Sequence, residues 1–305
     1  MPRPTAHRPE DLHITARRLT FDYQTPLRRN RYWHNQDPVV THFINALQAT
    51  FPEGERFFID AARDGERILL EKHAMDERLR QDLRLFIRQE ALHGHQHRQW
   101  TEALIREGYE RLADYDDQMR RLRLWFRKHF STRARLSITA AAEHYTASIA
   151  YLLTYVKPDL LTESQPPFRD VLLYHAMEEV EHKSVCYDLY QSLSRSYLGR
   201  LLGMLFVTFD LAIHVFVRHR YLLKKDGLWD RVHRRGVLRF FLGKQGLLKG
   251  LWPRIRAYAK PSFHPWQTDE REALERAFGR LRSQAGISPF QMGQEPLPPG
   301  LGSGP

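Results

Sequence analysis

Cysteine is almost absent from this 305-residue chain, which has one, Cys186. A single cysteine cannot form an intramolecular disulfide, so the chain is not a disulfide-stabilised secreted scaffold. The N-terminus also lacks the apolar run of a secretory signal, because it begins Met1-Pro2-Arg3-Pro4 and continues with many charges. We therefore expect a cytoplasmic protein.

Two common catalytic signatures are missing too, since neither a Ser/His/Asp triad nor a phosphate-binding loop is visible. No strand or hairpin pattern appears before residue 195. What the chain does have is 42% apolar residues, enough for a substantial core, and they recur with helical spacing. The sequence predicts an all-α fold.

Helix boundaries follow from caps and breakers. Asp37-Pro38 starts the first helix, and Asp64-Gly65 is expected to end the second. The expected helices cover residues 38–50, 51–63, 76–107, 113–130, 132–155 and 167–194. We divide the chain into an irregular N-terminal arm (1–36), a metal-binding helical bundle (37–195), a basic and partly apolar helical extension packed on it (196–285), and a disordered tail (286–305).

The strongest functional signal is the pattern Glu-x-x-His, which occurs twice on predicted helices. The two copies are Glu90-x-x-His93 and Glu179-x-x-His182. A lone glutamate precedes each copy at a matching distance, with Glu55 lying 35 residues before the first and Glu143 lying 36 before the second. Four-helix bundles bind two metal ions with one Glu from each of two helices and Glu-x-x-His from each of the other two. The pattern therefore predicts a dinuclear metal site.

Helical phase, at ~100° per residue, selects ligands from a crowded set. His175 shares one strip with Glu179 and His182, whereas Glu178, Glu181 and His95 point elsewhere. The predicted ligands are Glu55, Glu90, His93, Glu143, His175, Glu179 and His182. Glu53 is an alternative to Glu55, which we prefer because the apolar residues after it place its face inward. Whether His97 or Cys186 joins the site stays open.

Four buried carboxylates repel one another and lose their hydration, which costs several kcal/mol each. Two divalent cations would neutralise them. Ligation by oxygens and imidazoles suits iron or manganese, although the affinity order of divalent ions does not exclude zinc. We expect two iron ions, with manganese or zinc as alternatives, and we expect the four glutamates to carry the catalysis.

Three segments, residues 51–58, 88–95 and 175–183, resemble the bacterial family of predicted metal-dependent hydrolases, and the resemblance covers about residues 25–260. The ligand order is also similar to that of ferritin-like di-iron N-oxygenases that oxidise arylamines. The histidine that this group adds to the usual set matches His175. The resemblance implies a ferritin-like helical bundle with a dinuclear metal site, followed by C-terminal helices.

Three functions are compatible with these features. We favour an O2-dependent oxidase or oxygenase that uses two iron ions and an electron donor to oxidise a small organic substrate near Thr146 and Ala147. The first alternative is a metal-dependent hydrolase, in which a paired metal site lowers the pKa of a bridging water towards ~7. The second is a metal-binding or membrane-associated bundle without catalysis.

Positive charge is concentrated in residues 195–260, which contain 15 Lys or Arg and three acids. This segment carries +12, and the rest of the chain sums to −1, which gives the net charge of +11. The apolar run 201–217 is about as long as a bilayer span. Asp210 and His214 lie near its middle, so we expect a buried or interfacial helix instead. An anionic membrane is the expected partner, at the inner face of the cell membrane. No nucleic-acid motif is present, and a homodimer is left open.

Overall fold

The computed structural model describes residues 8–9, 12–244, 246–272, 275–276 and 279. Within these residues the regular structure is helical, with no strand, and an isolated bridge joins His34 to Ser164. The all-α class is confirmed. The predicted disordered tail, 286–305, lies outside the described residues.

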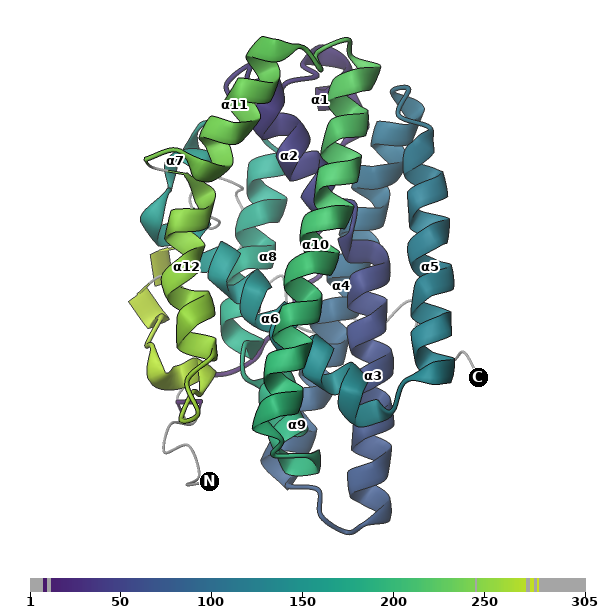
Figure 1. Ribbon diagram of the computed structural model, residues 1–305, viewed down its shortest axis with the longest axis vertical. Coiled ribbons are helices and arrows are strands. Elements are labelled where there is room, and N and C mark those ends of the chain that lie inside the picture. The colour runs from purple at the N-terminus through teal and green to yellow at the C-terminus, as the bar shows by residue number, and fades with distance from the viewer. Residues whose placement is uncertain (1–7, 10–11, 245, 273–274, 277–278, 280–305) are drawn as a thin grey trace.

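Four long helices form the central bundle (Figure 1). They are α3 (Phe51–Glu71), α4 (Glu77–Arg106), α6 (Thr132–Tyr151) and α8 (Phe168–His182). α3 packs against α4 and α6, and α8 packs against α6 and α4, so the four helices enclose a common interior. α5 (Arg111–His129) covers α3 from outside, and α9 (Val185–Leu193) packs against α6, α3 and α4.

The N-terminal part reaches the bundle through an irregular segment, residues 12–23, which is followed by α1 (Gln24–Arg29) and α2 (Pro38–Gln48). The predicted start of α2 is confirmed. The Asp37 carboxylate accepts hydrogen bonds from the backbone N–H groups of Val39 and Val40, and Pro38 occupies the first helical position.

The predicted end of the second helix at Asp64-Gly65 is wrong, because α3 continues to Glu71. Gly65 lies at a crowded contact instead of a turn. A Cβ atom there would come within 2.9 Å of Leu136 and 3.1 Å of Leu189. The glycine lets α3 approach α6 and α9 closely, and this packing compensates for its poor helix propensity.

The predicted helix over 167–194 is also wrong, since it is two helices, α8 and α9, separated at Lys183 and Ser184. The Lys183 side chain is buried at this point. Its ammonium group donates to the Glu270 carboxylate at 2.7 Å and to the Thr268 carbonyl at 3.0 Å. The break thus gives a buried cation an acidic partner from the C-terminal segment.

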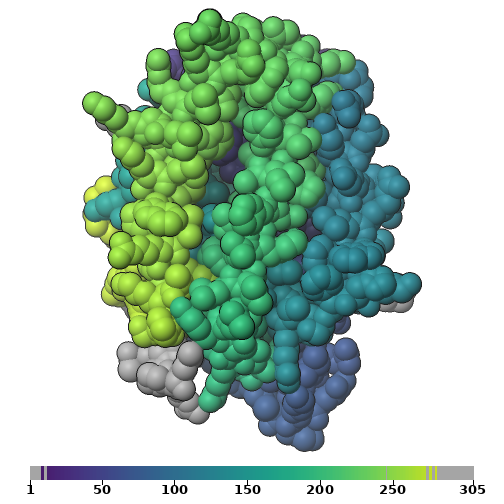
Figure 2. Space-filling model, viewed as in Figure 1, coloured from purple at the N-terminus to yellow at the C-terminus, as the bar shows by residue number. Residues whose placement is uncertain are grey.

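Three further helices form an outer layer on one side of the bundle (Figures 1 and 2). They are α10 (Tyr197–Lys225), α11 (Arg231–Leu242) and α12 (Leu247–Tyr258). α10 packs against α6 and α2. A Cβ atom at Gly203 would lie 2.5 Å from the Ser137 carbonyl, so glycine permits the close approach of α10 to α6.

α10 is the one helix of the described chain that is long and apolar enough to cross a membrane, with 28% of its most apolar window buried. Asp210 and His214, the polar residues in its middle, form an ion pair at 3.5 Å. Both side chains are partly buried. One face of α10 is therefore packed on the bundle, and its polar residues lie on that partly covered side.

Candidate metal centre

The structure brings all seven predicted ligands together in the interior of the bundle, where none is more than 6% exposed. α3 contributes Glu55, α4 contributes Glu90 and His93, α6 contributes Glu143, and α8 contributes His175, Glu179 and His182. The helical phase that selected these residues from the sequence is the reason that they share one interior. Their role as ligands stays a prediction.

The donor atoms form three overlapping groups in which all atoms lie within 4.8 Å of one another. The groups are Glu55, His93 and His175; Glu90, Glu143 and His182; and Glu90, His93 and Glu179. A cation about 2.0–2.2 Å from each donor holds its ligand atoms at most about 4 Å apart. These spacings are close to that requirement, and Glu90 belongs to two of the groups.

Three carboxylates lie close to His182. Its Nε2 atom lies 3.2 Å from Glu143 Oε2, 3.4 Å from Glu90 Oε1 and 3.4 Å from Glu179 Oε2. His175 is already engaged at both nitrogens, since Nε2 lies 2.6 Å from Glu179 Oε1 and Nδ1 lies 2.6 Å from His97 Nε2. Ligation through His175 Nε2 would replace its hydrogen bond to Glu179.

Several donor atoms of the centre are buried without a well-formed hydrogen bond. They are both carboxylate oxygens of Glu55, Glu90 and Glu143, both ring nitrogens of His93, and His182 Nε2. Each unsatisfied buried polar atom costs about 1–3 kcal/mol, more when charged, and folded proteins rarely retain several together. Divalent cations would satisfy all of them at once, so the residues present fit a metal centre.

The pKa directions of Glu55, Glu143 and His93 support the same conclusion. His182 differs, since burial lowers its pKa but the charges of Glu179 and Glu143 outweigh burial and raise that pKa well above the ordinary value. Burial, together with the charges of Glu179 and Glu143, raises the pKa of Glu55 well above its ordinary value, and burial raises the pKa of Glu143 to about 7. Burial likewise lowers the pKa of His93 well below its ordinary value. An imidazole kept neutral can bind a cation, and a cation would keep the carboxylates ionised.

Two neighbouring side chains fix the orientation of the histidines. Gln89 donates from Nε2 to Glu181 at 2.8 Å, so its Oε1 is left to accept from His182 Nδ1, also at 2.8 Å. His93 Nε2 lies 3.0 Å from Glu178 Oε2. The hydrogen bond to Gln89 leaves His182 Nε2 facing the centre, as outer hydrogen bonds do for metal-bound histidines. The contact with Glu178 leaves His93 Nδ1 on the side of Glu90 and Glu179.

Arg17 completes this outer layer. Its guanidinium contacts Glu178 Oε1 at 3.2 Å and Glu181 Oε1 at 2.5 Å, and all three side chains are buried. Helical phase predicts that Glu178 and Glu181 point away from the seven residues of the centre, and neither belongs to a donor group. Phase could not show that these two glutamates contact residues that orient the centre. Gln89 and Arg17 carried no signal in the sequence beyond Gln89 preceding Glu90.

The structure bears on three of the open alternatives without testing ligation itself. Glu53 faces away from the centre and pairs with Arg123 at 2.9 Å, which leaves Glu55 as the α3 carboxylate of the site. His97 belongs to none of the three donor groups, and it contacts His175 instead. Cys186 is buried and also outside those groups.

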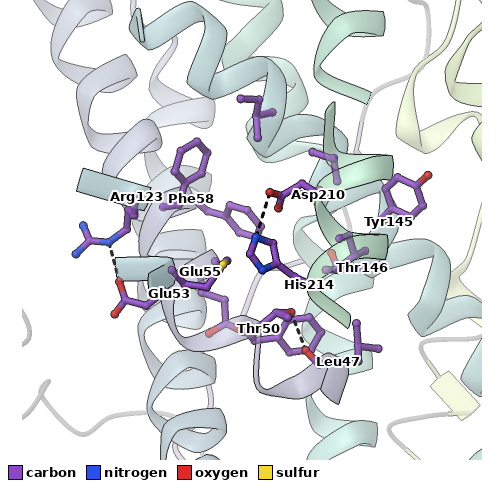
Figure 3. Close-up of a pocket in the computed structure, with 18 of the residues that line it drawn as sticks. Leu47, Thr50, Glu53, Glu55, Phe58, Arg123, Tyr145, Thr146, Asp210 and His214 are labelled. Carbon is purple, nitrogen blue, oxygen red and sulfur yellow. Dashed lines mark hydrogen bonds and ion pairs between the residues drawn. The ribbon is translucent and has the colours of Figure 1, made fainter. Parts of the chain in front are cut away.

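A cavity of about 120 Å³ adjoins the centre (Figure 3). Glu55, His175, Glu179 and Thr146 form its polar end, and most of its other lining residues are apolar. Thr146 Oγ1 donates a hydrogen bond to Glu179. The sequence predicts a substrate near Thr146 and Ala147. Thr146 lines the cavity, whereas Ala147 is buried and is not a lining residue. For comparison, an apolar cavity of ~150 Å³ can hold benzene.

A helical bundle whose interior holds carboxylates and imidazoles, many of them without hydrogen-bond partners, is typical of a metal-binding protein. Residues 15–269, most of the chain, match the family model described as predicted metal-dependent hydrolase. The chain belongs to this family, which supports a metal-dependent enzyme. No curated protein and no solved structure matches it.

Proposed function

We propose that the protein is a dinuclear metal enzyme that converts a small, largely apolar organic molecule bound in the cavity beside the metal centre. The observation that carries this proposal is a cluster of buried donor atoms without hydrogen-bond partners, one of whose residues, Glu55, also lines a largely apolar cavity together with His175 and Glu179. Neither feature is needed to stabilise the bundle.

The ligands would be the seven residues given above, with Glu90 positioned to serve both metals because it belongs to two donor groups. When bound, such a pair of cations polarises a substrate oxygen and activates water. Gln89 and Glu178 orient the two histidines, and Thr146 holds Glu179. The apolar walls of the cavity bind the substrate and exclude bulk water.

The reaction that the family supports best is hydrolysis. In this form of the proposal, an ester or amide lies with its apolar part along α10 and its scissile bond at the end of the cavity formed by Glu55, Glu179 and Thr146. Acyl transfer here would depend on metal, since the described residues that line the cavity include no serine or cysteine nucleophile.

Oxidation with iron, dioxygen and an electron donor is the second candidate. The donor set supports it, because four carboxylates and three imidazoles with no thiolate suit iron or manganese better than thiolate-favouring metals. The cavity supports it as well, since its apolar lining suits a substrate without a readily hydrolysed bond.

One set of measurements tests the proposal and separates the two reactions. Metal analysis of natively purified protein should give two ions per chain, and fewer than one would overturn the dinuclear site. Apoprotein loaded with zinc or manganese should cleave a medium-chain p-nitrophenyl ester without oxygen if the protein is a hydrolase. Apoprotein loaded with Fe(II) should consume dioxygen and develop a visible absorption band if it is an oxidase.

A matched pair of variants assigns the activity to the centre. Glu90→Gln removes a carboxylate shared by two donor groups, whereas Glu102→Gln makes the same change at an exposed position of the same helix. Only the first should lose metal and activity. Equal activity in both would show that the measured reaction occurs elsewhere.

A further inference from the structure

α10 carries a continuous stripe of exposed apolar side chains on the side that faces away from the bundle. The stripe consists of Leu198, Leu202, Leu205, Phe209, Ile213 and Phe216, which are 50–66% exposed. Their spacing of three or four residues places them in one line along the helix. Single exposed apolar residues are ordinary, but a stripe of this length is not.

The neighbouring helices extend this apolar surface. Leu238 and Leu242 on α11 and Leu248 and Trp252 on α12 are 45–63% exposed. α10, α11 and α12 lie on the same side of the molecule, where Figure 2 shows them forming most of one face. We call the exposed residues of these three helices the docking face.

Exposed basic side chains accompany the apolar residues at the C-terminal end of α10 and along α11 and α12. The exposed ones on or between the three helices are Arg220, Lys224, Lys225, Arg231, Arg234, Arg235, Arg239, Lys244, Lys249 and Arg256. Acids there are few and engaged, since Asp210 pairs with His214, Asp226 accepts from Tyr109 and His42, and Asp230 caps α11. The face therefore combines apolar contact area with strong positive charge.

We infer that the docking face binds the surface of an anionic phospholipid bilayer, with α10 lying in the plane of the interface. Its Leu and Phe side chains would enter the region between headgroups and acyl chains, and the Lys and Arg residues would contact lipid phosphates. Helices with an apolar face bordered by basic residues bind membranes in this way, through apolar burial and attraction to anionic lipids.

Other occupants fit the surface less well. A second copy would bring one +12 segment against another, and like charges across an interface are unfavourable. A transmembrane position would require α10 to leave α6 and α2, on which its inner face is packed, and would place Arg200 and Arg218 in lipid. Nucleic acid would leave the Leu and Phe stripe uncovered.

Docking would also place the cavity beside the bilayer, because Phe206, Val207 and Leu211 of α10 form part of its wall. If the proposed function is correct, an apolar substrate dissolved in the membrane would have a short path to the metal centre. The docking itself does not depend on metal or on activity, so it can be tested separately.

The test is flotation of the full-length, natively purified protein with two kinds of vesicle, phosphatidylglycerol mixed with phosphatidylcholine and phosphatidylcholine alone. We expect binding to the anionic vesicles and at least tenfold weaker binding to the neutral ones. Salt should weaken binding, since the Debye length falls from ~10 Å at 0.1 M to ~3 Å at 1 M. Absence of binding to anionic vesicles at low salt would overturn the inference.

Variants test the residues that carry the inference. The double change Leu202→Gln, Phe209→Gln should weaken binding at least tenfold, whereas Leu70→Gln, at an exposed position on α3, should not. Reversing charge with Arg234→Glu and Arg235→Glu should abolish the preference for anionic lipid, with Arg67→Glu on α3 as the control. Circular dichroism and thermal melting check that each variant is folded.

Two results would reassign the face. If the double variant of α10 floats as the wild type does, α10 is not the contact. If sedimentation velocity shows a concentration-dependent dimer that the double variant abolishes, and vesicles do not compete with it, the occupant is a second copy of the chain and the lipid inference is wrong.

Discussion

The metal centre and the docking face both depart from the usual rule that apolar residues are buried and ionisable residues are exposed. The centre buries ionisable side chains, and the docking face exposes apolar ones. At the centre, four carboxylates and three imidazoles lie inside the bundle, whereas on α10 a line of Leu, Ile and Phe lies outside it. Folded proteins ordinarily bury the second set and expose the first. The described chain does not neutralise the buried charges of the centre, and it does not cover the apolar side chains of α10. We propose metal ions for one and lipid for the other.

The two regions also differ in how buried charge is accommodated. Beside the centre, the Arg17 guanidinium forms ion pairs with both Glu178 and Glu181. Beneath α10, the buried Arg200 donates instead to the Tyr187 hydroxyl and the Lys260 carbonyl. Hydrogen bonds to neutral acceptors suffice for an isolated arginine, but closely spaced glutamates require cations.

The largest effect should come from removing the cation beside the centre. Arg17→Leu leaves two buried carboxylates without their partner, so we expect unfolding to become easier by about 3–5 kcal/mol, as for other broken buried ion pairs. Urea denaturation of the metal-loaded protein measures this change.

Arg67→Leu is the control for that experiment, because Arg67 forms an exposed ion pair with Glu71 on α3. Exposed pairs contribute only about 0–1 kcal/mol. If both variants unfold at the same urea concentration, the polar layer around the centre does not depend on Arg17, and the contrast between the two regions is weaker than we infer.

A second change tests the geometry of the centre without removing any ligand. A Cβ atom at Gly94 would lie 3.0 Å from Glu55 Oε2. Gly94→Ala should therefore displace the Glu55 carboxylate and weaken metal binding about 10–100-fold, in the range of outer-layer substitutions. The apoprotein should not lose stability, because Ala is the better helix former by about 0.5–1 kcal/mol. Metal titration and apoprotein melting measure the two quantities.

Gly54→Ala is the matched control on α3, where a Cβ atom would meet nothing within 4 Å. It should raise apoprotein stability by a similar amount and leave metal affinity unchanged. A loss of metal affinity in Gly54→Ala as large as in Gly94→Ala would mean that the effect is general to helix glycines rather than caused by contact with Glu55.

The gathering of these seven residues in one interior could be predicted from the sequence because helical phase is local. Glu179 and His182 share one strip of a helix, and His175, four residues before Glu179, lies on the same strip. The sequence then leaves open only which helices pack against each other. The all-α class followed from apolar periodicity for the same reason. These features need no knowledge of which segments meet in space.

What the sequence could not provide were contacts made across the fold. Gly65 resembles a helix end but is required by Leu136 and Leu189, and the break after His182 reflects a contact between Lys183 and Glu270. Arg17 comes from an irregular segment far from α8 in the chain. In each case the physical reason is a partner distant in sequence, which a local pattern cannot specify.

A smaller effect concerns the attachment of α10 to the rest of the protein. Asp226, at the end of α10, accepts hydrogen bonds from Tyr32 and Tyr109 and pairs with His42 at 2.9 Å. Although burial opposes it, the contact with His42 and these hydrogen bonds hold the pKa of Asp226 below its ordinary value of 3.8. A carboxyl with a lowered pKa stabilises the fold above its unfolded pKa, and this contribution is lost as the pH falls through the folded value.

Asp226→Asn should therefore be about 1 kcal/mol less stable than the wild type at neutral pH. The difference should persist down to about pH 4 and shrink below it. Urea denaturation at a series of pH values measures this, with Asp114→Asn at an exposed position of α5 as the control. A difference that grows on acidification would contradict the assigned sign.

The smallest effect on stability is expected at the docking face, although its effect on lipid binding should be large. Phe209 is 60% exposed, so Phe209→Gln removes little packing and should change the free energy of unfolding by less than about 0.5 kcal/mol. A buried phenylalanine replaced in this way would cost several times more. Thermal melting in solution measures the change in stability, and melting in the presence of anionic vesicles measures the stabilisation that lipid binding adds. A strong destabilisation in solution would show that the stripe is covered within the protein itself, and it would remove the reason for seeking an external partner.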